Sequence, residues 1–72
     1  MDKNNQLIRT DLRISNMNSV DEEIIVAKLL GKIEGVAKVY THHSLNKAEI
    51  YTSREVSIDE LQQALSGYNF NV

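Results

Sequence analysis

The chain has 72 residues, a formal net charge of −2 and 42% hydrophobic residues, a composition typical of one small folded domain. The slight acidic excess argues against binding to duplex DNA, which depends on many cationic contacts with phosphates. There is no cysteine, which excludes disulfides, thiolate metal ligands and thiol catalysis. No apolar run approaches the roughly 20 residues of a membrane-spanning helix, and the polar N-terminus lacks the apolar stretch of a signal peptide. We therefore expect a cytoplasmic domain.

The first predicted element is a strand. Residues 1–6 are polar and are expected to be disordered, which leaves residues 7–72 as the domain. From Ile8 to Ile14, apolar residues or threonine alternate with charged residues. This period of two predicts a half-buried strand, and residues 15–18 are expected to form the loop that follows it.

Ser19 begins a predicted helix that extends to Ile33. Residues 19–22 fit a capping box, in which the serine accepts a hydrogen bond from the third helical amide and Glu22 reaches back. Gly35 is placed to end the helix in the left-handed conformation. Five apolar residues fall on one arc and are expected to face the core: Ile25, Val26, Leu29, Leu30 and Ile33.

The second half of the chain contains a predicted hairpin, which is followed by a second capped helix and a last strand. Residues 36–43 and 48–53 predict two strands, with Asn46 as the turn former between them. Residues 57–60 form a second capping box before a short helix that Gly67 is expected to end. The apolar stripe of that helix is expected to consist of Ile58, Leu61, Ala64 and Leu65, and the last strand to contain Tyr68, Phe70 and Val72.

The element order is therefore β-α-β-β-α-β. This order predicts an α+β ferredoxin-like sandwich, in which a four-stranded antiparallel sheet has the strand order 4-1-3-2. Right-handed crossovers place both helices on one face of that sheet.

Three stretches of the chain resemble the heavy-metal-associated domain family, which includes copper chaperones. Residues 12–22, Leu-Arg-Ile-Ser-Asn-Met-Asn-Ser-Val-Asp-Glu, resemble the family pattern L-x-I-x-G-M-x-C-x-x-C. The stretch Leu30-x-x-Ile33-x-Gly35-Val36-x-x-Val39 resembles L-x-x-L-x-G-V-x-x-V, and the likeness returns in Val56-Ser57-x-x-x-Leu61-x-x-Ala64-Leu65 followed by Gly67-Tyr68. The resemblance covers residues 10–68 and implies the same ferredoxin-like fold.

The chain departs from the family at the residues that carry its chemistry. Ser19 and Glu22 stand where the family has its metal-binding cysteines, and Asn16 replaces the preceding glycine. Cu(I) prefers thiolate or thioether ligands, which a hydroxyl and a carboxylate do not supply. We therefore expect Ser19 and Glu22 to cap the helix, and Met17, which matches an inward-packing methionine of the family, to lie in the core.

The histidines leave a metal-binding interpretation open. His42 and His43 follow the second strand, and the topology brings this hairpin to the same end of the domain as residues 17–22. Adjacent strand residues point to opposite faces, so only one histidine can join Glu22. Weak binding of a divalent metal ion by Glu22 and His43 is thus the alternative to a domain without any cofactor.

One line of small and apolar residues is a candidate docking surface. Val20, Ile24, Ala27 and Gly31 follow one side of the first helix, opposite its core arc. An exposed apolar line of this kind suits a protein partner or a second copy of the chain.

The sequence contains no sign of an active site. We find no nucleophile paired with a base, no glycine-rich phosphate loop and no convergent carboxylates, so we expect no enzyme. The resemblance and the docking line together predict a non-catalytic module in a metal-handling or metal-transport context. It would bind a protein partner or itself, but neither nucleic acid nor a membrane. The alternative is a metal-ion binding or transport domain that uses Glu22, a histidine or partner groups as ligands.

Overall fold

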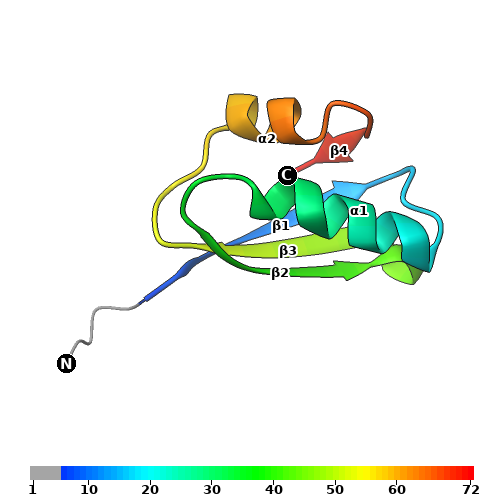
Figure 1. Ribbon diagram of the computed structural model, residues 1–72, viewed down its shortest axis with the longest axis horizontal. Coiled ribbons are helices and arrows are strands. Elements are labelled where there is room, and N and C mark those ends of the chain that lie inside the picture. The colour runs from blue at the N-terminus through cyan, green and yellow to red at the C-terminus, as the bar shows by residue number, and fades with distance from the viewer. Residues whose placement is uncertain (1–5) are drawn as a thin grey trace.

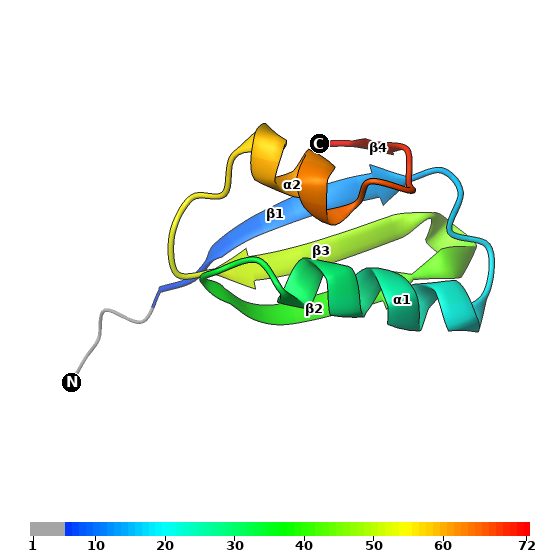
Figure 2. The same ribbon diagram turned by 45° about the horizontal axis from the view of Figure 1, so that its top comes forward.

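The computed structural model describes residues 6–72, and it shows an antiparallel sheet with two helices on one of its faces (Figures 1 and 2). The elements in chain order are β1 (Ile8–Ile14), α1 (Val20–Gly31), β2 (Val36–His42), the short 3-10 helix η1 (His43–Leu45), β3 (Lys47–Thr52), α2 (Ile58–Ala64) and β4 (Phe70–Asn71). Residues 1–5, on which most of the predicted disordered segment falls, lie outside the described residues.

The sheet has the predicted ferredoxin-like topology. Its strand order is β2-β3-β1-β4, which is the order 4-1-3-2 read from the other edge. β1 pairs with β3 along six residues, from Ile8 opposite Thr52 to Arg13 opposite Lys47. On its other side β1 pairs with β4 only at Arg13 and Ile14. β1 is thus the strand that joins the hairpin to the C-terminal strand.

The core lies between the sheet and the two helices. Its fully buried apolar residues are Leu12, Ile14, Met17, Val26, Leu30, Ala48, Ile50, Leu61 and Leu65. The inward positions of β1 and β3 alternate with exposed or half-buried ones, as a period of two requires. Thr52 is buried as well, and its hydroxyl donates to the Arg54 carbonyl at 2.5 Å, which satisfies the buried polar group.

The prediction that Ile25 faces the core is wrong, and the apolar stripe predicted for the second helix is not buried at Ile58. Their side chains are 46% and 49% exposed. Ile25 lies one turn before Leu29, on the side of α1 that faces α2, where a groove separates the two helices. Ile58 is the first residue of α2, which packs on the sheet one turn later through Leu61.

Several helices and strands begin or end one or two residues away from their predicted bounds. α1 ends at Gly31, two residues before the predicted end, although Gly35 does adopt the expected positive φ of 93°. β2 ends at His42, while β3 begins at Lys47 and ends at Thr52, each within one residue of its predicted bounds. Leu65 caps α2, and the Tyr68 amide donates to the Leu65 carbonyl at 2.9 Å.

These shifts shorten the C-terminal elements. The turn after α2 includes Tyr68, so the predicted strand from Tyr68 to Val72 is reduced to Phe70–Asn71. Gly67 is not needed as a left-handed residue, because the helix has already ended. Within residues 6–72, neither helix has the length and apolarity needed to cross a bilayer.

The packing of α1 yields a prediction for stability. Leu30→Ala should lower the free energy of unfolding by about 2–5 kcal/mol, because it empties a fully buried position. Ile25→Ala should cost about 1 kcal/mol or less, because half of the side chain already contacts water. Urea denaturation of both variants measures the difference. Equal losses would show that Ile25 belongs to the core.

Candidate functional site

The loop between β1 and α1, residues 15–19, lies at the same end of the sheet as the β2–β3 connection (Figure 1). Asn46 links the two: its Nδ2 donates to the carbonyl of Ile14 at 3.1 Å and to that of Met17 at 3.2 Å. Met17 is fully buried, as expected. The loop of residues 15–19 matches the metal-binding loop of the family that the sequence resembles. It is held in place by the buried Met17 side chain and by the hydrogen bonds from Asn46 of the β2–β3 connection.

Asn16, which stands in place of the family glycine, anchors the opposite side of this loop. Its Oδ1 accepts a hydrogen bond from the Asn69 amide at 3.0 Å, and its Nδ2 donates to the Gly67 carbonyl at 3.3 Å. The side chain thus ties the loop to the connection between α2 and β4. A glycine at this position would make neither of these hydrogen bonds.

Ser19 and Glu22 bind backbone amides at the start of α1. Ser19 Oγ accepts from the Glu22 amide at 3.3 Å, as a cap should. The Glu22 carboxylate accepts from the Asn18 amide at 3.0 Å, one residue before the position expected for a capping box. Ser19 thus satisfies a free amide of the first turn, and Glu22 satisfies an amide of the loop just before the helix.

The structure pairs His43 with Glu23 rather than with Glu22. Glu23 Oε2 lies 2.6 Å from His43 Nδ1 and also accepts the His43 amide at 2.6 Å. These hydrogen bonds, first that of the amide and then that of the ring, lower the pKa of Glu23. His42 is exposed and makes only a small electrostatic contribution to the pKa of Glu23.

One feature of the sequence indicates which side of α1 carries Glu23. It lies three and seven residues before the buried Val26 and Leu30, a spacing that places all three on one side of the helix. This side faces β2, whose Thr41 hydroxyl donates to the Glu23 carbonyl at 3.3 Å. Among residues 6–72 there is no cluster of three or more histidine, aspartate or glutamate side chains that is suited to a metal ion.

The predicted docking line is open to solvent over its first half. Val20 is 58% exposed and Ile24 is 52% exposed, while Ala27 is half-buried. We call these three residues the α1 ridge. It starts directly after Ser19, so it borders the loop of residues 15–19.

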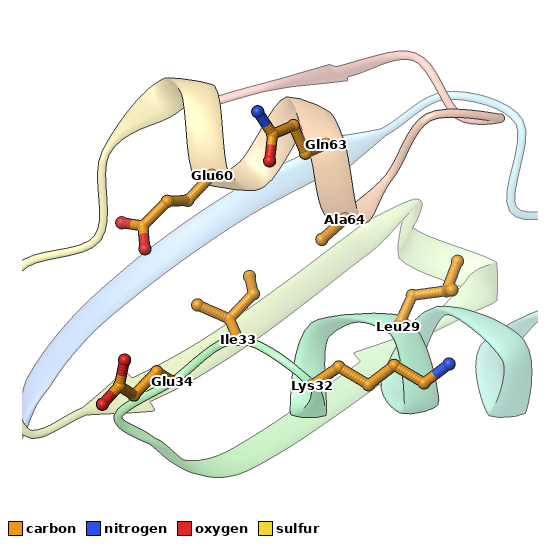
Figure 3. Close-up of a pocket in the computed structure, with 7 residues that line it drawn as sticks. All are labelled: Leu29, Lys32, Ile33, Glu34, Glu60, Gln63 and Ala64. Atoms are coloured by element: carbon orange, nitrogen blue, oxygen red, sulfur yellow. The ribbon is translucent and has the colours of Figure 1, made fainter.

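A groove of about 400 Å³ lies between α1 and α2 (Figure 3). It is lined by Leu29, Lys32, Ile33, Glu34, Glu60, Gln63 and Ala64. One acidic residue at its rim is already paired: Glu60 lies 2.6 Å from an Arg54 nitrogen. This pairing, with help from the Ser57 amide, lowers the pKa of Glu60 to about 2. The groove offers an apolar floor and a charged rim rather than a reactive group.

The Glu23–His43 pair predicts a dependence of stability on pH. Since the folded state lowers the pKa of Glu23, the ionised carboxylate stabilises the fold above the ordinary glutamate range and loses this effect as pH falls through the folded pKa. Glu23→Gln should therefore lower the melting temperature at neutral pH, and the difference from the unmodified chain should vanish in acid. Asp21→Asn, the same loss of charge in the same turn, is the control. A constant difference down to acid pH would contradict this role of the carboxylate.

Several solved structures superpose on nearly the whole length of this chain. Oxidized MerP from Ralstonia metallidurans CH34 superposes with a TM-score of 0.79 at 25% identity, over 90% of this chain and 94% of that chain. The N-terminal soluble domains of Bacillus subtilis CopA match with a TM-score of 0.77 at 27% identity, over 89% of this chain and 46% of that chain. The Atx1-Cu(I)-Ccc2a complex matches with a TM-score of 0.67 at 20% identity, over 88% of this chain and 90% of that chain.

The comparisons establish the fold of the chain. No protein-family model matches the sequence, and no curated protein is similar to it by sequence search. The structural neighbours nevertheless share its fold over nearly the whole chain, and they include the HMA domain of a copper chaperone for superoxide dismutase. The resemblance in residues 10–68 led to the expectation of this same fold. The chain therefore has the fold of a heavy-metal-associated (HMA) domain, and it contains no cysteine.

Proposed function

We propose that this domain is a non-catalytic module that binds a protein partner, or a second copy of itself, through the α1 ridge. The observation that carries the proposal is the exposure of Val20 and Ile24, which lie one turn apart on the same side of α1. Branched apolar side chains that are adjacent and exposed form a surface that gains stability when a partner covers it.

The comparisons support a metal-handling context for this interaction. MerP and CopA have the same fold, and another neighbour is a complex in which two proteins, Atx1 and Ccc2a, are held together with Cu(I). We infer that the present domain engages a partner of that kind in the same cellular setting. It does so without thiol exchange, because Ser19 and Glu22 replace the cysteines and bind backbone amides instead.

The Glu23–His43 pair supports a second candidate function, weak binding of a divalent metal ion. A ring nitrogen and a carboxylate oxygen 2.6 Å apart are two ligands of the type that Zn(II) takes, so a partner or water would have to complete the set. Calorimetric titration with Zn(II), Cu(II) and Cu(I) tests this function. Binding at one equivalent that is lost in Glu22→Ala or Glu23→Ala would favour metal binding over the module without a metal.

The α1 ridge yields a prediction for association. Ile24→Lys should abolish binding to a second copy or to the soluble domains of metal-transport proteins from the same genome, because it places a charge at the centre of the apolar contact. The melting temperature should stay nearly unchanged, since the side chain is already exposed. Sedimentation equilibrium and binding titrations measure the first effect, and thermal unfolding measures the second.

Ile25→Lys is the matched control for this experiment. It changes the same residue type at similar exposure on another side of the same helix, so it should leave association intact. If Ile24→Lys strongly destabilised the fold, or if both variants bound equally well, the α1 ridge would not be the docking surface.

The positions of the missing thiols yield a prediction for Cu(I). Ser19→Cys combined with Glu22→Cys should bind Cu(I) tightly, since the two side chains lie three residues apart at the start of α1, where the helix dipole favours thiolates. The double variant should lose about 0.5–2 kcal/mol of stability with the Ser19 cap, and Cu(I) should restore it by binding only the folded state.

Competition with a Cu(I) chelator measures this binding in the unmodified chain, the double variant and Ser19→Cys alone. We expect tight binding only in the double variant. Tight binding by the unmodified chain would refute the absence of a soft-metal site, and no binding by the double variant would refute the assignment of positions 19 and 22.

A further inference from the structure

β1 has a free edge beside β4. Only Arg13 and Ile14 of its seven residues pair with β4, and by the same register Val72 lies opposite Leu12. The edge of β1 from Ile8 to Asp11 therefore has no strand beside it among the described residues, as Figure 2 shows. β4 pairs with the other half of this edge, so the edge can accept an antiparallel strand.

The hydrogen bonds show which backbone groups are free. The Ile14 amide donates to the Asn46 carbonyl on the side of β3, whereas the Ser15 amide donates to the Asn69 carbonyl on the side of β4. Because antiparallel strands alternate in this way, the even-numbered residues of β1 bind β3. The N–H and C=O groups of Arg9 and Asp11 therefore point to the free edge.

The side chains along this edge have a simple pattern. Arg9 and Asp11 lie on the open face of the sheet, each about half exposed, and Arg9 Nε lies 2.9 Å from Asp11 Oδ1. On the opposite face, where the helices lie, Ile8 is 40% exposed and Thr10 is half-buried. The edge thus presents opposite charges on one face and a partly uncovered apolar surface on the other.

The second open edge of the sheet is less suited to a new strand. β2 has a register shift between Val36 and Lys38, and bulges and edge lysines are features that prevent edge pairing. Its Thr41 side chain is also bound to α1. β1 has no such irregularity between Ile8 and Arg13.

We propose that the free edge of β1 binds an extended segment of another protein as an additional antiparallel strand in line with β4. This surface is separate from the α1 ridge and goes beyond the proposed function. Backbone groups of Arg9 and Asp11 provide the affinity, as in other cases of strand addition. The side chains set the preference: a basic residue opposite Asp11, an apolar residue opposite Thr10 and an acidic residue opposite Arg9.

A second copy of the chain fits this edge less well than an isolated segment does. Two antiparallel copies of β1 would be related by an axis perpendicular to the sheet, so both helix layers would lie on the same side. α2 lies on the helix side of the sheet close to the free edge of β1 (Figures 1 and 2), so α2 of each copy would meet the other. A single extended segment brings no helix with it.

The test uses the full chain and two peptides of identical composition. Lys-Val-Glu-Val-Thr has the proposed order of charges when it runs antiparallel to β1, and Glu-Val-Lys-Val-Thr has them reversed. In an NMR titration of the labelled chain, the first peptide should shift the amide signals of Arg9 and Asp11 and slow their hydrogen exchange about tenfold or more. The reversed peptide should bind several-fold more weakly, because like charges then lie opposite each other.

Two variants distinguish the contribution of the Asp11 backbone N–H to peptide binding from that of the Asp11 charge. Asp11→Pro removes an N–H that points to the free edge and leaves the β3 ladder intact, so it should weaken binding about tenfold or more. Asp11→Asn keeps the N–H and should bind the first peptide only a few-fold more weakly. Ile24→Lys should bind like the unmodified chain, which keeps this proposal distinct from that for the α1 ridge.

The outcomes are decisive even if Asp11→Pro fails to fold, because hydrogen exchange in the unmodified chain is independent of it. Signals of Arg9 and Asp11 that stay unchanged with both peptides would overturn the proposal. Protection of these two amides in the free chain, together with the mass of a dimer, would overturn it in favour of a second copy at this edge.

Discussion

The hydrogen bonds of Asn46 hold the candidate site together. Asn46 adopts φ 50° and ψ 46°, a left-handed conformation that asparagine tolerates better than most residues. Its backbone carbonyl accepts the Ile14 amide, while its side chain donates to the carbonyls of Ile14 and Met17. This one residue therefore ends the β2–β3 connection, extends β1 by one pairing and fixes the loop that leads to α1. The burial of Met17 and the position of Ser19 both depend on that loop being fixed.

The polar residues that replace the family's site residues belong to the same scaffold. Asn16 binds the backbone of residues 67 and 69, and Ser19 and Glu22 bind amides at the start of α1. Each contact satisfies a backbone group that would otherwise need water. Asn16, Ser19 and Glu22 thus form hydrogen bonds with the backbone. Cysteines in a thiol site would instead leave their sulfur atoms available to a metal ion. Apolar side chains that the core does not use, Val20 and Ile24, are exposed beside this region.

Polar side-chain pairs connect neighbouring elements. Glu23 and His43 tie the first turn of α1 to η1, and Arg54 and Glu60 tie the segment after β3 to the first turn of α2. Arg54 also lies against Gly35, where a Cβ would come within 3.0 Å of its side chain, so Gly35 provides both the positive φ and the space. These side chains are partly exposed, and the groove between the helices stays open. The groove and the α1 ridge therefore remain accessible on the helix side.

Local patterns were enough to predict the order of strands and helices, the caps at Ser19 and Ser57, the turn at Asn46 and, with the resemblance, the fold and the buried Met17. They succeed because a period of two or of 3.6 residues shows which side of an element is apolar. The same patterns placed Ile25 in the core and paired His43 with Glu22, whereas the structure leaves Ile25 half exposed and pairs His43 with Glu23. They also predicted a longer last strand than the structure contains, and they gave no register between that strand and β1. An amino-acid pattern describes one element at a time, and only the tertiary structure decides which neighbouring element reaches each side of it, how far that neighbour extends, and which apolar or polar groups are left for a partner.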